Sequence, residues 1–396
     1  MHYDLVIVGG GPAGLSLACL AGGFGLRIAV IDQQCLDQLA SPARDGRDIA
    51  LTHRSVQILE KAGAWSTIAA EDIAPIRRAC VKNADESHVL SFDHDCTGRA
   101  ALGYLVSNQI LRAALYRAAR NDENVEFITG DTATGLELGG PLAGISLTSG
   151  KTLTAPLVVA ADSRFSAMRR KAGIGADIRD FGHVCIVCRL KHEEPHDGTA
   201  YEWFDTDQTL AILPLNNRQS SIVITQPANS AARTMELPPQ AFADDVERRF
   251  AGRWGRMELS CDRHAYPLVA VYADRFYGDR FALVGDAAVG MHPVTAHGFN
   301  FGLRGAETLA GKVREAIGAG LDIGSAAVLE SYDHEHRRTT FPLYVATNAL
   351  VRLYTADSFP ARIARSGILR IGDRLSPIKD FMLRRLTELD ERLPLN

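Results

Sequence analysis

The first fourteen residues constrain the fold more than any other stretch of the chain. Residues 3–8, YDLVIV, form an apolar run of strand type, residues 9–14 read GGGPAG, and a helix-like apolar segment follows. In this context Gly9 permits a tight turn, Gly11 lets the backbone approach a pyrophosphate, and Gly14 allows close packing of helix against strand. The helix N-terminus adds free N–H groups and partial positive charge. A dinucleotide-binding fold is therefore predicted.

A second strand, RIAVID, ends at Asp32, about 20 residues further on, where a carboxylate would accept hydrogen bonds from the adenosine ribose. A glycine-rich turn that binds no nucleotide is the alternative interpretation. The ordered set of strand, turn, helix and acidic residue favours the nucleotide. The predicted cofactor-binding residues of this segment are Gly9, Gly11, Pro12, Ala13, Gly14 and Asp32.

Composition narrows the class of protein. With 396 residues, 46% of them hydrophobic, we expect two domains. A net charge of −4 and no block of like charges give no footprint for nucleic acid. The N-terminus lacks the pattern of a signal peptide and no apolar run is long enough for a membrane span, so a cytoplasmic protein is expected. Seven scattered cysteines indicate reduced thiols, and Cys185 and Cys188 should lie on opposite faces of one strand rather than form a redox or metal site.

Two further segments resemble the internal motifs of the single-component FAD-dependent aromatic hydroxylases: LVVAADSRFSAMRRKAG at 157–173 and RFALVGDAAVGMHPVTAHGFNFGLRGAETLAGKV at 280–313. The chain is most similar to the ubiquinone-biosynthesis hydroxylases of this class, and the similarity extends through residues 46–65, 102–118 and the tail 347–386. The resemblance implies an α/β fold. It would combine a Rossmann-like FAD-binding domain of the para-hydroxybenzoate hydroxylase type, an inserted antiparallel-sheet substrate domain and C-terminal helices.

Residues 181–225 alternate strand-like runs with turns, which predicts an antiparallel sheet, and residues 238–252 read as a helix against it. Tyr201, Trp203 and Phe204 in this region are assigned to the core, with a substrate wall as the alternative. The predicted domains are an FAD-binding domain of 1–175 and 268–345, with 71–96 contributing in part to the substrate domain, a substrate domain of 176–267, and a C-terminal helical region of 346–396.

The resemblance also assigns residues to the cofactor. Asp286, at the end of the strand FALVGDAA, would bind the ribityl chain of FAD, and the helix expected from Gly298 to Lys312 would point its N-terminus at the flavin pyrimidine. Arg47 matches an arginine at the flavin and donor entrance, with an ordinary solvated arginine as the alternative. The full set implied in these segments is Arg47, Gln109, Asp162, Arg169, Gly285, Asp286, Pro293, Gly298, Phe299 and Asn300.

Three departures from the family pattern stand out. Ser163 replaces a glycine after Asp162, so either the glycine conformation is not needed or serine adopts it at a cost. Val289 replaces a histidine, and Ala296-His297 replaces Gly-Gln. His292 and His297 have no further ligands nearby in the sequence, so no metal site is predicted, and His297 is kept as a weak candidate for contact with substrate or donor.

By resemblance, NAD(P)H or another donor reduces FAD, O2 adds to the flavin, and the resulting C4a-hydroperoxide hydroxylates an electron-rich aromatic ring. The implied substrate is lipophilic, a polyprenylated intermediate of ubiquinone biosynthesis such as demethoxyubiquinol. Hydroxylation of a small aromatic, reduction of an isoprenoid chain and a flavin redox sensor without turnover are the alternatives. No catalytic base can be named from the sequence.

The tail from 360 to 389 reads as two amphipathic helices, and residues 362–385 carry seven Lys or Arg against two Asp. One interpretation is a patch for anionic lipid headgroups, with peripheral association at the inner face of the membrane or with a ubiquinone-biosynthesis complex. The other is a solvated face of helices that pack on the FAD domain.

Overall fold

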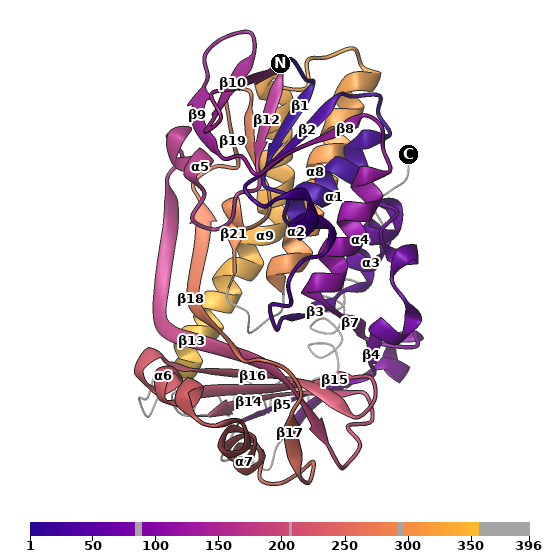
Figure 1. The fold of residues 1–396 in the computed structure, drawn as a ribbon, viewed down its shortest axis with the longest axis vertical. Coiled ribbons are helices and arrows are strands. Elements are labelled where there is room, and N and C mark those ends of the chain that lie inside the picture. Colours follow the sequence, from indigo (N-terminus) through magenta and orange to yellow (C-terminus); the bar gives the residue numbers. More distant parts are fainter. Residues whose placement is uncertain (84–88, 206–207, 292–296, 356–396) are drawn as a thin grey trace.

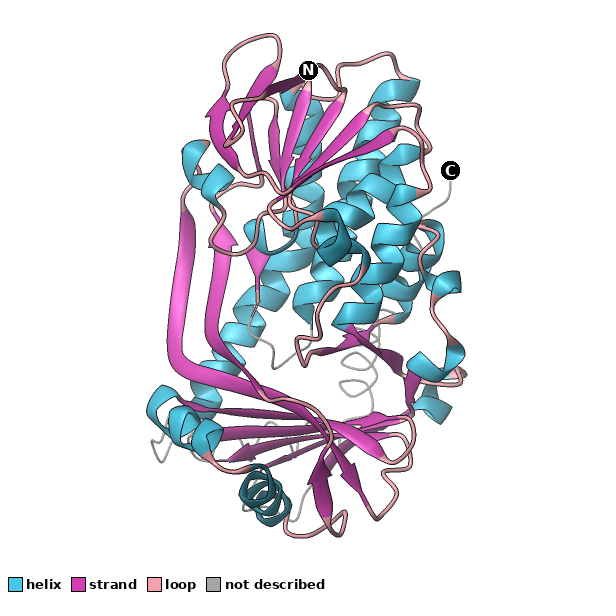
Figure 2. Ribbon diagram, viewed as in Figure 1, coloured by secondary structure: helices cyan, strands magenta, loops and turns pink. Residues whose placement is uncertain are grey.

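The computed structural model describes residues 1–83, 89–205, 208–291 and 297–355 (Figure 1). Its elements form two layered regions, and two long strands run between them (Figure 2). Among the described residues, no helix combines the length and the hydrophobicity needed to cross a bilayer.

The first region is built on a six-stranded sheet whose order is β19-β20-β12-β1-β2-β8. All neighbouring strands are parallel except the β19–β20 pair. The four residues of β1, LVIV, are all buried, as expected for a strand covered on both faces. The strands are β1 (Leu5–Val8), β2 (Ile28–Asp32), β8 (Val125–Thr129), β12 (Leu157–Ala160), β19 (Tyr277–Gly278) and β20 (Phe281–Leu283).

Helices cover one face of this sheet and a small antiparallel sheet, β11-β10-β9, joins the same core on the other side (Figure 1). Helix α8 packs on α1 and on the long α9. The helices are α1 (Pro12–Gly22), α2 (Leu36–Ala40), α3 (His53–Lys61), α4 (Asn108–Arg120), α5 (Ala167–Lys171), α8 (His297–Gly318) and α9 (Ala326–Thr355), and the small strands are β9 (Ala133–Glu137), β10 (Ala143–Leu147) and β11 (Thr152–Ala155).

The second region is a nine-stranded sheet with the order β21-β18-β13-β16-β15-β14-β5-β6, and β17 also pairs with β13. Neighbours are antiparallel except β14 and β5, which are parallel. Its strands are β5 (Arg78–Asn83), β6 (Val89–Asp93), β13 (Ala176–His192), β14 (Thr199–Asp205), β15 (Gln208–Leu215), β16 (Gln219–Pro227), β17 (Met257–Leu259), β18 (His264–Ala273) and β21 (Val289–Gly290).

Helices α6 (Ala228–Glu236) and α7 (Pro239–Arg249) lie on one side of the large sheet (Figure 1). The three-stranded sheet β3 (Asp48–Leu51), β7 (Gly103–Ser107) and β4 (Ala74–Ile76) lies on the other. The predicted fold class is thereby confirmed. The predicted domain limits stay a prediction; the large sheet also takes strands from 78–93, and β18 continues across residue 267.

The cysteine pair of β13 behaves as expected. Cys188 lies in the core beneath α7, and Cys185 lies in a separate buried cluster with Val187 and Leu268, on the opposite face. All seven cysteines are within the described residues and are free thiols.

Candidate functional site

The turn between β1 and α1 requires glycine at two positions for the protein's own packing. Gly9 has a φ of +116°, and a Cβ there would overlap the carbonyl of Ala161. A Cβ on Gly14 would overlap the carbonyl oxygen of Gly9, because the first turn of α1 packs directly on the loop. The backbone therefore approaches closely at Gly9 and at Gly14, and the loop packs tightly against the ends of β1 and β12.

Gly11 is different, because the space beside it is open. It is the N-cap of α1 with a φ of −79° and a ψ of 178°, a conformation that any residue adopts, and an added Cβ would meet no atom within 4 Å. No side chain caps α1, and Pro12 begins the helix. An uncapped helix N-terminus beside open space fits a pyrophosphate, so the residues at the start of α1 are suited to the pyrophosphate of FAD.

The carboxylate of Asp32 is fixed by the backbone around it. Its Oδ2 accepts a hydrogen bond from the N–H of Gly10 at 2.7 Å, and its Oδ1 accepts one from the N–H of Gln34 at 2.8 Å. The side chain of Gln34 in turn accepts a hydrogen bond from Arg112 of α4 at 2.7 Å. Asp32 is therefore held at the edge of the glycine turn, where the sequence predicts a ribose.

The segment after β12 is a tightly braced turn. Asp162 accepts hydrogen bonds from the hydroxyl of Ser166 at 2.5 Å and from the N–H of Met168 at 3.1 Å. Ser163, where the family resemblance implies a glycine, has a φ of 78°, so serine does adopt the left-handed conformation. Such a residue costs about 1–3 kcal/mol, which the bonds around Asp162 must offset.

Arg169 of α5 joins this turn to the one after β20. It is almost completely buried, and its Nη1 donates to the carbonyl oxygens of Arg164, at 3.1 Å, and Ala287, at 3.0 Å. Arg169 therefore links the loop after β12 to the loop after β20. The resemblance assigned Arg169 to FAD, and a direct contact with the cofactor stays a prediction.

Replacing Arg169 with methionine should lower the free energy of unfolding by about 3 kcal/mol, since two carbonyl groups lose their donor at about 1–3 kcal/mol each. The neighbouring Arg170→Met is the matched control, because Arg170 is exposed and bonds only to the nearby carbonyl of Phe165. Chemical denaturation of both FAD-free variants is the measurement. Equal stability of the two variants would contradict the bracing role.

The third segment places Asp286 at the end of β20, in the short 3-10 helix η4 (Gly285–Ala287). Its Oδ2 forms an ion pair with Nη2 of Arg164 at 3.0 Å, and Arg164 also donates to the carbonyl of Val269 at 3.0 Å. The Asp286 side chain remains 34% exposed, and within the described residues nothing donates to its Oδ1. One carboxylate oxygen is therefore available to a polyol.

The start of α8 is tied to β3 by Asn300. Its amide donates to the carbonyl of Ala50 at 2.9 Å, and its Oδ1 accepts from the N–H of Thr52 at 3.2 Å. His297, the first residue of the helix, is buried with its ring 5.8 Å from that of Phe301. The helix predicted from Gly298 to Lys312 is confirmed, and it continues to Gly318.

The three loops that follow β1, β12 and β20 meet at one place. A Cβ on Gly285 would lie 2.7 Å from that of Ala13, and the Cβ position of Gly302 is 3.6 Å from both Ala13 and Gly285. With the contact between Gly9 and Ala161, the loops after β1, β12 and β20 converge at the same edge of the parallel sheet (Figure 1). The ends of parallel strands are where nucleotide cofactors bind in such folds.

Arg47 lies in a polar cluster at the boundary between the two regions. It pairs with Asp45 at 2.6 Å and lies over the ring of Tyr266, at 5.4 Å from its centroid. Asn108 donates to the same carboxylate at 2.7 Å, and the hydroxyl of Tyr266 donates to the carbonyl of Asp45 at 2.6 Å. Burial would raise the pKa of Asp45, but the Arg47 charge and these hydrogen bonds hold it below its usual value. Half of the Arg47 side chain is exposed, as an entrance position requires.

The remaining predicted residues divide by location. Gln109 lies half-buried in the first turn of α4, Gly298 has open space at its Cβ position, and Phe299 packs at the margin of the main core. Pro293 and His292 lie outside the described residues. Sequence reasoning missed Arg164, Asp45 and Asn108. Arg164 and Asn108 have partners that are distant in the chain, whereas Asp45 pairs with Arg47 two residues away. The charge of Arg164 within the second motif was an available signal.

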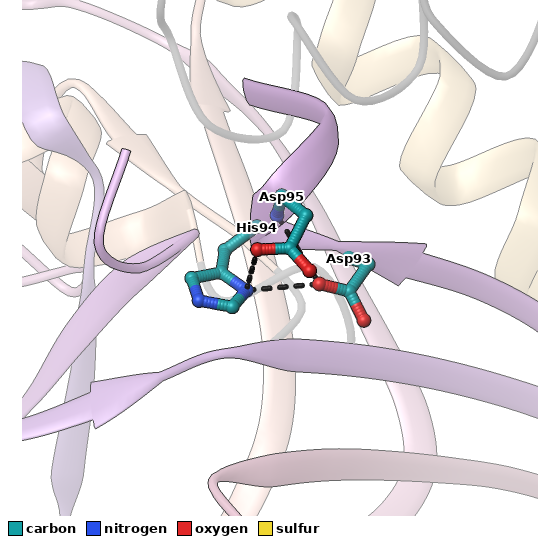
Figure 3. A group of neighbouring side chains, drawn as sticks. All are labelled: Asp93, His94 and Asp95. Carbon is teal, nitrogen blue, oxygen red and sulfur yellow. Dashed lines mark hydrogen bonds and ion pairs between the residues drawn. The ribbon is translucent and has the colours of Figure 1, made fainter. Parts of the chain in front are cut away.

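One group in the described part of the chain is compact enough to hold a metal ion: Asp93, His94 and Asp95, at the end of β6 (Figure 3). Asp93 already pairs with Arg78 at 2.7 Å and with Nδ1 of His94 at 2.8 Å. Hydrogen bonds from His94 and Arg78 lower the pKa of Asp93. The group is therefore a partly exposed ion-pair network.

Comparison with known proteins agrees with this geometry. Residues 2–343 match the family model described as FAD binding domain. The ubiquinone hydroxylase UbiM of Neisseria meningitidis is 41% identical over 98% of this chain and 85% of its own length, and the ubiquinone hydroxylase UbiL of Rhodospirillum rubrum is 33% identical over 96% and 88%. The crystal structure of p-nitrophenol 4-monooxygenase PnpA from Pseudomonas putida superposes with a TM-score of 0.77 at 18% identity, covering 98% of both chains, which is a likeness of fold.

Proposed function

This chain belongs to the FAD-binding-domain family, in the branch of the ubiquinone hydroxylases, and we propose that it hydroxylates the aromatic ring of a polyprenylated phenol of ubiquinone biosynthesis. It is an FAD-dependent monooxygenase. The observation that best supports the proposed reaction is the meeting of the loops after β1, β12 and β20 at one sheet edge, opposite the face of the large, mainly antiparallel sheet. The similarity to UbiM over nearly the whole chain supports the substrate class.

Bound FAD, once reduced, supplies the activation of O2 that hydroxylation of an aromatic ring requires. The role of the protein is to bind the cofactor and the substrate and to orient them. The N-terminus of α1 at Gly11 would receive the pyrophosphate, Asp32 the ribose, and Oδ1 of Asp286 the ribityl hydroxyls. The N-terminus of α8 would stabilise negative charge on the pyrimidine edge of the reduced ring.

We place the electron donor, NAD(P)H, at the exposed guanidinium of Arg47. The ion pair with Asp45 and the ring of Tyr266 orient this arginine at the boundary of the two regions. A cation at an open entrance suits a donor that docks transiently and carries phosphate groups. The aromatic substrate would lie further in, against the large sheet, beside the segment 45–48, whose Asp45 and Asp48 contact Tyr266 and Arg189 of that sheet. A substrate held there would be shielded from water.

Complementation tests this function. Expression in bacterial strains that are each blocked at one ring hydroxylation of ubiquinone synthesis should restore ubiquinone in at least one strain, read by mass spectrometry of extracted quinones. Accumulated precursor should gain one oxygen. Failure in every strain, together with substrate-independent oxidation of NADH and NADPH by the purified flavoprotein, would contradict the proposal; a reduced prenyl chain would indicate an isoprenoid reductase.

We also propose that the basic tail, residues 360–389, which lies outside the described residues, draws the enzyme to anionic membranes, where a polyprenylated substrate resides. The full chain should co-sediment with vesicles that contain phosphatidylglycerol and remain in solution with phosphatidylcholine alone. Replacing Arg362, Arg365, Arg370 and Arg374 by glutamine should abolish the difference. Equal sedimentation with both kinds of vesicle would overturn this proposal.

A further inference from the structure

Glu202 lies near the centre of β14, on a strand whose neighbouring side chains face the other way. Trp203 stacks on Phe250 with ring centroids 5.4 Å apart, and Tyr201 contacts Trp254 at the same distance, so both turn to the side of the sheet that α7 covers. Since side chains alternate along a strand, Glu202 lies on the opposite face.

That opposite face is turned toward the cofactor-binding half of the molecule. On it, Arg189 of β13 forms an ion pair with Asp48 of β3, and Tyr266 of β18 donates to the carbonyl of Asp45. Figure 1 shows β3 and β7 above this side of the sheet, with α7 below it. Glu202 therefore shares a face with residues that contact the segment 45–48.

The carboxylate of Glu202 lies in an apolar row. In the register of the sheet, Glu202 pairs with Val81 on one side and with Ala211 on the other, and the row continues through Val223 to Val187. No described residue donates a hydrogen bond to Glu202 or pairs with it. Burial among these residues raises the pKa of this half-buried carboxyl to about 8.

Among the residues that the structure describes, the other ionisable groups of this face leave Glu202 without a charged partner. Burial, with a smaller contribution from Glu202 itself, raises the pKa of the Cys185 thiol to about 12, so the thiol is neutral. Arg189 is paired with Asp48, and Arg47 with Asp45. The ionisable groups that line the face or cover it are Cys185, Arg189, His264 and Tyr266 of the sheet, and Asp45, Arg47 and Asp48 of the covering segment.

We propose that Glu202 binds the ring hydroxyl of the phenolic substrate and accepts its proton. This rests on the proposed function. The aromatic ring would lie on the apolar row, and its hydroxyl would donate to the one unpartnered carboxylate there. In the reaction the phenol O–H bond breaks and a Glu202 O–H bond forms, which raises the electron density of the ring; the proton returns when the product leaves.

A base is most effective when its pKa is near the working pH, which this environment provides. This pKa sets the direction in which phenol binding changes with pH. Below pH 8 Glu202 is mostly protonated and neutral, and above pH 8 it is a carboxylate, which accepts a phenol O–H more strongly. Affinity for a phenol should therefore rise between pH 7 and 9, as the ionised fraction increases roughly tenfold.

Ligand binding to the FAD-loaded protein tests the assignment without turnover. The probes are guaiacol (2-methoxyphenol) and 1,2-dimethoxybenzene, which has the same ring but no hydroxyl, with affinity read from the flavin absorbance at pH 7 and 9. For the unmodified protein we expect guaiacol affinity to rise about tenfold and that of the ether to stay constant. Glu202→Gln should lose the pH dependence, and the exposed Glu258→Gln on β17 should keep it.

Glu202→Asp keeps the carboxyl group, so its affinity for guaiacol should still depend on pH, with a shifted midpoint. If Glu202→Gln loses its flavin and cannot be measured, this variant tests the assignment instead. The assignment is overturned if Glu202→Gln keeps the dependence of the unmodified protein, or if the unmodified protein shows none. Either result would leave the proposed hydroxylation standing, because that is tested separately by restoration of ubiquinone in blocked strains.

Discussion

Gly11→Val abolishes tight FAD binding and leaves the FAD-free protein as stable as before. Valine adopts the extended conformation of this N-cap, and its side chain would enter the open space beside α1 without meeting the protein. That space is where the pyrophosphate should approach the backbone. We expect FAD affinity to fall by about a hundredfold or more, which is ~2.7 kcal/mol. Titration of apoprotein with FAD, followed by flavin fluorescence, measures it.

In contrast, Gly14→Ala, in the same turn, should destabilise the FAD-free protein. Alanine favours a helix interior over glycine by about 1 kcal/mol. Its Cβ would, however, overlap the carbonyl oxygen of Gly9, and backbone cannot move aside cheaply. We expect a net loss of roughly 2 kcal/mol or more in the stability of the FAD-free protein. If Gly11→Val destabilised the apoprotein as much as Gly14→Ala, the space beside Gly11 would not be a ligand site.

Asp286→Ala should purify with little or no flavin. The ion pair with Arg164 is about one-third exposed on each side and contributes only about 0–1 kcal/mol to stability, so the fold should survive its loss. The missing carboxylate oxygens should instead remove the hydrogen bonds to the ribityl hydroxyls. The ratio of flavin to protein absorbance after purification is the measurement.

Two variants separate binding from folding at Asp286. Asp262→Ala, at an exposed aspartate, should keep full flavin occupancy. Arg164→Gln removes the partner but keeps the Asp286 carboxylate, so it should retain more flavin than Asp286→Ala. Full occupancy in Asp286→Ala would show that the cofactor site is misplaced.

The features that the sequence predicted best are those set by neighbours in the chain. Gly9, Gly11 and Gly14 act within a single turn, and the helix from Gly298 follows from local periodicity. The α/β fold with an antiparallel insertion follows from the order of strand and helix patterns. Ser163 posed a clear local alternative, and its positive φ decides it.

Contacts between residues that are far apart in the sequence could not be predicted from local patterns. Arg164 meets Asp286 across 122 residues, and Asn300 meets Ala50 across 250. Arg169 was assigned to the cofactor by resemblance, whereas its observed bonds go to backbone carbonyls of two loops. Glu202 has no motif at all; its environment arises only when five strands, β5 and β13 to β16, lie in register.

Titration of the purified, flavin-stripped protein with FAD tests the central claim most directly. We expect saturable binding of one FAD per chain, with the absorbance of an enclosed flavin, since the loops at Gly11, Asp162 and Asp286 would surround a single cofactor. A folded protein that leaves the absorbance and fluorescence of the added FAD unchanged throughout the titration would contradict this claim.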